Sequence, residues 1–354
     1  MKHIFIGILT AILLLSPFKG FSETLTPKRI TEWSRTAAQG DAGAQFNLGL
    51  LHAKGQGVPK NYAEAFKWFH LAALQGNAQA QLCLGAMYHD GLGVPKNYAE
   101  ALKWVRLAAQ QGNVQAQLYL GAMYANGLGV PQSYSEALKW FHLAALQWNA
   151  QAQFNLGLLL AKGQGVPQSY PEAFKWVRLA ANQGLADAQF NLGAMYANGQ
   201  GTPQNDAEAF KWFHLAANQG LAGAQCNLGA MYANGQGTPQ NYAEAFKWVR
   251  LAALQGNAQA QLYLGAMYVN GQGTPQNYAE AFKWVRLAAL QGNTQAQFYL
   301  GAMYANDLGV QKNYAEALKW VRLAALQEIS KCTESTRTLM RTLIEKGIQK
   351  PEHP

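Results

Sequence analysis

Residues 42 to 76 read AGAQFNLGLLHAKGQGVPKNYAEAFKWFHLAALQG, and near-copies of this stretch follow at a spacing of 36 residues. A fixed period of this length is typical of stacked supersecondary units. The sequence therefore predicts an all-α solenoid of eight 36-residue helix–turn–helix repeats over residues 41 to 328, with a cap at each end. The period is marked by one tryptophan in every copy: Trp68, Trp104, Trp140, Trp176, Trp212, Trp248, Trp284 and Trp320.

Each repeat carries start and stop signals for two helices. In the first copy, a helix is predicted over residues 42 to 54, with Gly55 as a left-handed cap after it. Asn61 is the expected N-cap of a second helix, which extends to about residue 75. Two copies carry the stricter Ser-x-x-Glu capping box, at Ser133/Glu136 and Ser169/Glu172.

A glycine lies inside the first helix of every repeat. A helical glycine costs about 1 kcal/mol relative to alanine. Its recurrence predicts a point where a neighbouring backbone comes too close for a side chain. The column is Gly49, Gly85, Gly121, Gly157, Gly193, Gly229, Gly265 and Gly301.

The two ends of the chain differ from the repeats. Residues 1 to 22 combine a basic start, a short apolar run and small residues before Glu23, and they are interpreted as a secretory signal peptide cleaved after Ser22, with an uncleaved anchor as the alternative. Residues 23 to 40 are expected to form an N-terminal capping helix that opens at Thr26 and Pro27, and residues 329 to 354 a C-terminal capping helix and tail. The predicted location is periplasmic or secreted, without an integral membrane segment once the signal is cleaved.

Composition excludes several classes of function. The net charge of +9 permits acidic partners without requiring them. The three cysteines are too few and too scattered for a disulfide framework, and we expect them to be unpaired. No zinc motif, phosphate loop or dinucleotide fingerprint is present in the predicted mature chain, so no metal, no cofactor and no catalytic residue is predicted. The tryptophans are expected to pack between repeats rather than stack on nucleic acid.

The first helix of each repeat predicts a candidate binding groove. Projection at 100° per residue places Ala44, Leu48 and Leu51 toward the core, and the columns that begin at positions 43, 47, 50 and 54 on the opposite side. Amide and tyrosine side chains around an alanine floor favour contact with a protein or peptide, with ordinary solvated surface as the alternative. The groove candidates are Asn47, Gln79, Gln115, Tyr119, Gln151, Asn155, Asn191, Asn227, Gln259, Tyr263, Gln295 and Tyr299.

The second helix presents charge on its outer side. Glu64 and Lys67 recur in every copy at a spacing that allows local ion pairs. The next column is cationic, at His70, Arg106, His142, Arg178, His214, Arg250, Arg286 and Arg322. This column is interpreted as a solvated face or as a surface for an acidic glycan. Trp148 replaces the glycine between two helices and is expected to project from a turn as a candidate local contact.

The pattern A-x-x-x-L-G-x-x-Y-x-x-G-x-G-V-P-x-x-Y-x-x-A-x-x-W-x-x-x-A-A-x-x-G resembles the Sel-one-like repeat, a relative of the tetratricopeptide repeat. The resemblance covers residues 41 to 328 and implies a right-handed αα-solenoid whose concave groove is lined mainly by the first helices. It also implies a non-enzymatic adaptor or regulator at the bacterial envelope or host interface, and we expect a monomer. Two alternatives stay open: a β-lactam-binding or hydrolysing enzyme, as in cysteine-rich relatives, and an envelope glycan-binding module.

Overall fold

The computed structural model describes residues 26 to 330, which form seventeen α-helices and no strand. This confirms the all-α class. The predicted signal peptide and the predicted C-terminal capping helix from residue 331 onward lie outside the described residues. The N-terminal capping helix is present as α2, Pro27–Ala38, and Thr26 caps it by accepting a hydrogen bond from the Arg29 backbone.

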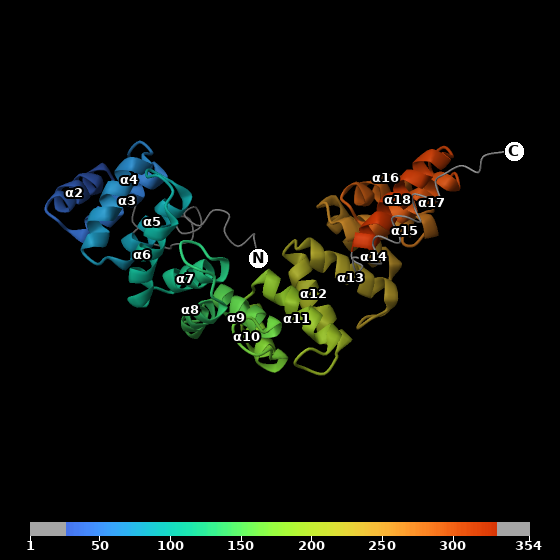
Figure 1. The fold of residues 1–354 in the computed structure, drawn as a ribbon, viewed down its shortest axis with the longest axis horizontal. Coiled ribbons are helices and arrows are strands. Elements are labelled where there is room, and N and C mark those ends of the chain that lie inside the picture. The colour runs from blue at the N-terminus through green and yellow to red at the C-terminus, as the bar shows by residue number, and fades with distance from the viewer. Residues whose placement is uncertain (1–25, 331–354) are drawn as a thin grey trace. The chain divides into compact units, whose positions relative to one another are not determined.

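The chain divides into two compact units, Met1–Gln183 and Gly184–Pro354, and the boundary falls between two repeats (Figure 1). The helices of the first unit are α2 (Pro27–Ala38), α3 (Ala42–Lys54), α4 (Tyr62–Leu74), α5 (Ala78–Asp90), α6 (Tyr98–Gln110), α7 (Val114–Asn126), α8 (Tyr134–Leu146), α9 (Ala150–Lys162) and α10 (Tyr170–Asn182). Those of the second unit are α11 (Ala186–Asn198), α12 (Asp206–Asn218), α13 (Ala222–Asn234), α14 (Tyr242–Leu254), α15 (Ala258–Asn270), α16 (Tyr278–Leu290), α17 (Thr294–Ala305) and α18 (Tyr314–Ser330).

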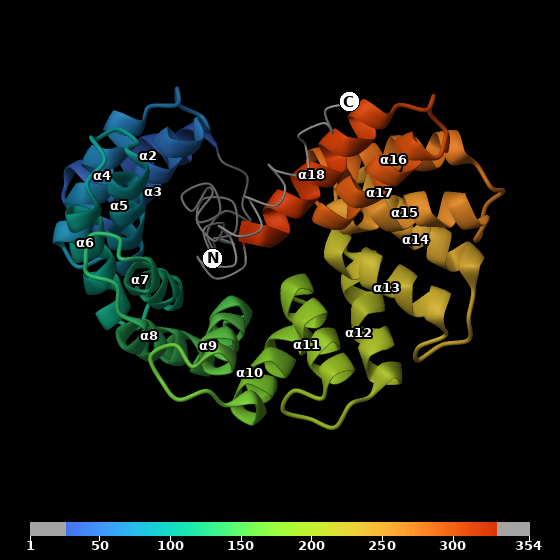
Figure 2. The same cartoon turned by 45° about the vertical axis from the view of Figure 1, so that its right-hand side comes forward.

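Each repeat is a pair of helices, here named the A helix (α3 and every second helix after it) and the B helix (α4 and every second helix after it). Within each unit an A helix packs against its own B helix, and each B helix packs against the next A helix. In the first unit the A helices lie on the inner side of a curved stack and the B helices on the outer side (Figure 2). The solenoid arrangement is therefore confirmed within each unit.

Local signals set the helix ends as predicted. Gly55 takes the left-handed conformation, with φ of 70°, and its N–H donates to the Leu51 carbonyl at the end of α3. Asn61 caps α4 by accepting hydrogen bonds from the backbones of Ala63 and Glu64. Both helices of the first repeat end within a residue of the predicted positions.

The expected capping boxes are only half formed. Ser133 accepts from the Glu136 backbone at 3.3 Å, but the Ser133 N–H donates to the Tyr124 carbonyl of the A helix instead of to the glutamate side chain. The Glu136 carboxylate pairs with Lys139. The second box, at Ser169 and Glu172, has the same arrangement. The N-cap backbone thus ties the two helices of a repeat together.

The glycine column is the point of closest contact between the two helices of each repeat. A Cβ atom added at Gly85 would lie 2.5 Å from Val105 Cγ2 and 3.1 Å from the Ala101 carbonyl oxygen. The predicted close approach is confirmed. The tryptophans pack between repeats, also as predicted: Trp104 is 6% exposed and belongs to the apolar cluster that contains Phe69 and Ala72 of the preceding repeat.

Candidate functional site

The A helices are buried on more sides than the helical projection predicts. The column that begins at Leu50 was expected to lie opposite the core, yet Leu50 is 1% exposed, Ala86 0% and Ala122 4%, and its members in the five later repeats are half-buried. In the first unit the reason is that successive A helices share apolar clusters, as Leu50 does with Cys83 and Ala86 of the next A helix. An A helix such as α5 therefore packs against its own B helix, the preceding B helix and a neighbouring A helix. Little of its surface remains free.

The predicted groove residues differ widely in exposure. Tyr119 and Asn155 are each only 4% exposed, so the expectation that they present an open surface is wrong. The Tyr119 ring belongs to the cluster of Leu120 and Met123, where burial, followed by the nearby charge of Asp90, raises the pKa of its phenol. Asn47, Gln151, Asn191, Asn227 and Tyr263 are half-buried, and Gln79, Gln115, Gln259, Gln295 and Tyr299 are exposed.

Half-buried amides on this face already use some of their hydrogen-bonding groups. The Asn191 side chain donates to the Asp187 carbonyl of the preceding turn at 2.8 Å. Gln151 donates to the Asn155 side-chain oxygen at 3.0 Å. The exposed glutamines and Tyr299 are the predicted residues most open to a partner.

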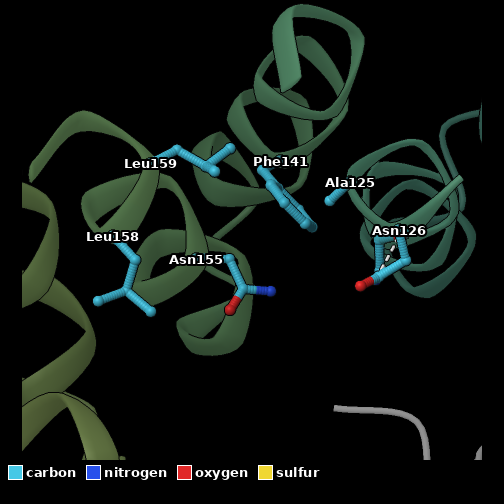
Figure 3. A pocket seen from close by; sticks show the side chains of 7 residues that line it. Ala125, Asn126, Phe141, Asn155, Leu158 and Leu159 are labelled. Atoms are coloured by element: carbon cyan, nitrogen blue, oxygen red, sulfur yellow. Dashed lines mark hydrogen bonds between the residues drawn. The ribbon is translucent and has the colours of Figure 1, made fainter. Parts of the chain in front are cut away.

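A small pocket opens between the A helices α7 and α9 and the B helix α8 (Figure 3). Its volume is about 20 Å³, and its lining is mostly apolar. Asn155 lies at one side of it and Asn126 at the other. The lining residues are Ala122, Ala125, Asn126, Phe141, Asn155, Leu158 and Leu159.

The B helices carry charged side chains in a regular pattern. Glu64 and Lys67 form an ion pair at 2.6 Å, and each of the other seven repeats has the equivalent i, i+3 pair, as predicted. Exposed pairs of this kind contribute only a few tenths of a kcal/mol, roughly, to stability. In the cationic column, Arg106 donates to the Tyr124 hydroxyl at 2.9 Å, whereas Arg250, Arg286 and Arg322 are exposed.

Trp148 projects from the turn between α8 and α9, as the sequence predicts. Its side chain is 69% exposed, and its φ of 62° lies in the region that favours glycine. The other A helices that follow a B helix in the described chain are entered through glycines with positive φ, such as Gly112 at 83°. The turn therefore holds a strained, exposed aromatic residue.

A buried glutamine system was not anticipated from the sequence. Gln81 is 4% exposed; its amide donates to the Ala73 carbonyl at the end of the preceding B helix, and its oxygen accepts from Gln111. The signal was present: glutamine occupies both positions in all eight repeats. The first position is Gln45, Gln81, Gln117, Gln153, Gln189, Gln225, Gln261 and Gln297, and the second is Gln75, Gln111, Gln147, Gln183, Gln219, Gln255, Gln291 and Gln327.

The described residues contain no cluster of three or more histidine, cysteine or acidic side chains that could hold a metal. Cys83 and Cys226 are free and buried, as expected, and Cys332 lies outside the described residues. Burial raises the pKa of Cys83 to about 12 and that of Cys226 to about 11, so neither thiol is poised as a nucleophile. None of the helices within residues 26 to 330 has the length and apolarity needed to cross a bilayer.

Stacked helix pairs, one polar A-helix face and charged B helices define an αα-solenoid repeat scaffold. The Sel1 repeat model matches residues 42–77, 78–113, 114–147, 150–185, 186–221, 222–257, 258–293 and 294–328. The chain therefore belongs to the Sel1 repeat family, whose solenoid scaffolds typically serve as protein-interaction modules.

Two solved structures resemble the chain over nearly its whole length. A Sel1 repeat protein from Oxalobacter formigenes is 33% identical, with 95% of this chain and 93% of that chain covered and a TM-score of 0.67. A protective antigen of uropathogenic Escherichia coli strains, which displays an SLR fold, is 30% identical, with coverages of 97% and 89% and a TM-score of 0.53. No curated protein matches the chain.

Proposed function

We propose that the chain is an exported, non-enzymatic scaffold that binds a protein or peptide partner through the polar face of its A helices. The observation that carries the proposal is the polar and mostly uncharged character of that face, on which amide side chains recur from repeat to repeat. Exposed Gln79, Gln115, Gln259 and Gln295 recur beside half-buried asparagines and Tyr263, so hydrogen bonds are available without charges to desolvate.

The B-helix face is a weaker candidate for the same partner. Its glutamates and lysines are paired within each helix, and such pairs satisfy one another locally. A partner on that face would have to replace these pairs or bind around them.

The exposure of each tyrosine determines which variants can test partner binding without unfolding the chain. Tyr119 belongs to the core, so its truncation would confound binding with folding. Tyr263→Ala and Tyr299→Ala remain suitable, because Tyr263 is only half-buried and Tyr299 is 49% exposed. Partner capture from an envelope extract should be lost in the double variant and retained in a control with Lys67→Ala and Lys283→Ala on the B helices. Equal capture by both folded variants would mean that the binding face has been misplaced.

The proposal also states that the protein is exported and that it is not an enzyme, and each of these two statements has its own test. Export rests on residues 1 to 22, and N-terminal sequencing of the protein recovered from its native compartment should begin at Glu23. Turnover of a chromogenic β-lactam by the purified chain would contradict the non-enzymatic assignment and favour the alternative drawn from cysteine-rich relatives.

A second candidate function is supported by Arg250, Arg286 and Arg322. These three side chains are exposed on the successive B helices α14, α16 and α18 of the second unit. A row of guanidinium groups suits an acidic glycan of the envelope. Co-sedimentation with peptidoglycan should then weaken as salt is raised and in the charge-reversed triple variant. Sedimentation that is unchanged by both would exclude this role.

A further inference from the structure

The last repeat leaves an apolar groove open between α17 and α18, at the C-terminal end of the described chain (Figure 1). The volume of this end groove is about 330 Å³. Phe298 on α17 is 57% exposed, and Leu318 on α18 is 58% exposed. The same residue types at equivalent positions of earlier repeats are buried, since Phe154 is 7% exposed and Leu102 is 9% exposed. The last repeat thus presents to solvent a surface that those repeats bury.

In the preceding repeat, the next A helix covers this surface. Val285 of α16 belongs to one apolar cluster with three residues of α17, which are Ala296, Leu300 and Met303. The equivalent of Val285 in the last repeat is Val321, and it lines the end groove. Within residues 26 to 330, no helix follows α18 to take the place that α17 takes over α16. An occupant of the end groove must therefore present apolar side chains with the spacing of an A helix.

The chain that continues from α18 carries the two end signals of an A helix. Residues 331 to 354 lie outside the described residues, but their sequence can be compared with α15. Asn257 caps the start of α15, and Gly271 follows its end in the left-handed conformation. Thr333 and Gly347 have the same separation, and both are residue types that suit these two positions.

The segment between these signals also repeats the apolar spacing of α17. Thr336, Met340 and Leu343 stand at the positions of the three α17 residues that cover the preceding repeat. Leu339 and Ile344 widen the same stripe. As a helix, the segment would have one apolar side, directed as an A helix directs its own toward the repeat before it.

The remaining positions of the segment are those of a terminal cap. Thr338 and Thr342 stand where an A helix contacts the following repeat. Arg341 stands at the place of Gly301, where an added Cβ would lie 2.6 Å from Val321 Cγ2 of the partner B helix. A side chain there excludes the close contact that an A helix makes with its own B helix. A polar outer face is what the last element of a repeat array needs.

The extra length of α18 accounts for the displacement of the segment from the 36-residue period. α18 has 17 residues and α16 has 13, a difference of about one helical turn. Two residues then separate Ser330 from Thr333, as in the connection from α16 to α17. Cys332 takes the glycine position of this connection, and Trp148 shows that the turn forms without glycine. The same short turn therefore leads the segment back along α18.

We propose that residues 333 to 347 form a helix that docks in the end groove of the same chain, antiparallel to α18. The polar first part of the segment lies beside the extra turn of α18, and Met340 and Leu343 cover Phe298 and Leu318. The connection of two residues holds the segment next to its own groove, which favours this docking over that of a second copy. The sequence alone predicts a C-terminal capping helix, and the end groove adds its docking surface and its register.

The test is hydrogen exchange of the full chain, followed by mass spectrometry over residues 333 to 347. Amides of the docked segment should exchange at least about tenfold more slowly than those of a synthetic peptide of the same sequence. The double variant Phe298→Ser with Leu318→Ser should lose this protection, because the groove loses its apolar contacts. The control is Leu251→Ser with Leu287→Ser, which removes exposed leucines of α14 and α16 outside the end groove and should keep the protection.

Variants of the segment supply the reciprocal measurement. Met340→Asp with Leu343→Asp should uncover the end groove, so that the chain binds the apolar dye ANS more strongly than the parent chain. Thr338→Asp with Thr342→Asp, on the polar side of the same segment, should leave dye binding unchanged. Circular dichroism checks that all four double variants are folded.

Three results would overturn the docking within the chain: no protection of the parent segment, protection that survives in the folded groove variant, or equal dye binding by the two segment variants. Protection that falls when the chain is diluted would assign the end groove to a second copy and would overturn it as well. Partner capture through Tyr263 and Tyr299 is measured separately, so failure of the docking leaves the proposed function intact.

Discussion

The Gln75 amide nitrogen lies 2.7 Å from the Gln45 side-chain oxygen, and Gln45 in turn donates to the Ala37 carbonyl at 3.1 Å. One buried amide thus joins the end of its own B helix to the end of the preceding B helix or capping helix. The Ala37 carbonyl belongs to the last turn of α2, where backbone acceptors lack partners within the helix. This pair of hydrogen bonds, here called the glutamine relay, recurs in both units, for example at Gln111, Gln81 and Ala73 and at Gln255, Gln225 and Ala217.

Replacement of Gln81 by leucine should destabilise the chain by about 1 to 3 kcal/mol, because two hydrogen bonds are lost, each worth about 0.5 to 1.5 kcal/mol. The Ala73 carbonyl keeps only the Gly76 N–H, and the Gln111 amide loses its partner. Urea unfolding followed by circular dichroism measures the change. Gln79→Leu, on the exposed side of the same helix, is the control and should stay within about 0.5 kcal/mol of the parent chain. Equal effects of the two substitutions would show that the relay adds no stability.

Two glycines of α13 should respond in opposite directions to alanine. At Gly229 a Cβ would lie 2.5 Å from Val249 Cγ2 and 3.1 Å from the Ala245 carbonyl, so Gly229→Ala should cost at least about 1 to 3 kcal/mol. At Gly223 the nearest atom is 3.5 Å away, and Gly223→Ala should stabilise the chain by about 0.4 to 1 kcal/mol. Thermal unfolding of both variants is the measurement. A destabilised Gly223→Ala protein would contradict the packing argument.

Trp148→Gly should raise the stability of the chain. Tryptophan at a φ of 62° is strained by about 1 to 2 kcal/mol, and glycine is not. The melting temperature should increase, whereas Gly112→Ala at the equivalent turn should lower it. If Trp148→Gly is more stable than the parent chain but captures less partner, the exposed indole ring contacts the partner. A melting temperature that is unchanged or lower would show that Trp148 is not strained.

Stability should decrease at alkaline pH through Cys83. Its pKa is raised to about 12 in the folded chain, by burial, from 9.0 in its unperturbed state. The unfolded chain therefore releases the thiol proton first, and the protonated thiol favours folding fully below about pH 9 and progressively less up to about pH 12. Across that window the Cys83 contribution should fall by about 1.4 kcal/mol per pH unit. Urea unfolding of the parent chain and of Cys83→Ala at pH 8 and at pH 10 isolates the contribution of this thiol. If the two proteins differ in free energy of unfolding by the same amount at both pH values, the thiol makes no pH-dependent contribution.

The periodic features were predictable because each is set by local chemistry. Gly55, Asn61 and the Gly49 column act within one repeat, through the left-handed cap, the N-cap and the close A–B contact. These signals fix the helices to within a residue. The period itself identifies the solenoid.

The candidate site was less predictable because exposure depends on neighbouring repeats. A helical projection assumes one buried side, but Tyr119 and Asn155 are covered by adjacent elements. The glutamines that recur at the positions of Gln45 and Gln75 gave no signal of burial in the sequence, although those at the Gln45 position are buried. Periodicity alone does not separate a polar residue that faces water from one that satisfies a helix end.

The glutamine relay also determines whether a repeat can be gained or lost without breaking hydrogen bonds between repeats. Each Gln81-type amide reaches only its own repeat and the one before it. If a segment of 36 residues is duplicated or lost in register, each glutamine amide of the relay still finds an equivalent carbonyl acceptor in the repeat that now precedes it. Recombination between the segments that encode these similar repeats would therefore lengthen or shorten the scaffold and leave every relay hydrogen bond at the junction intact.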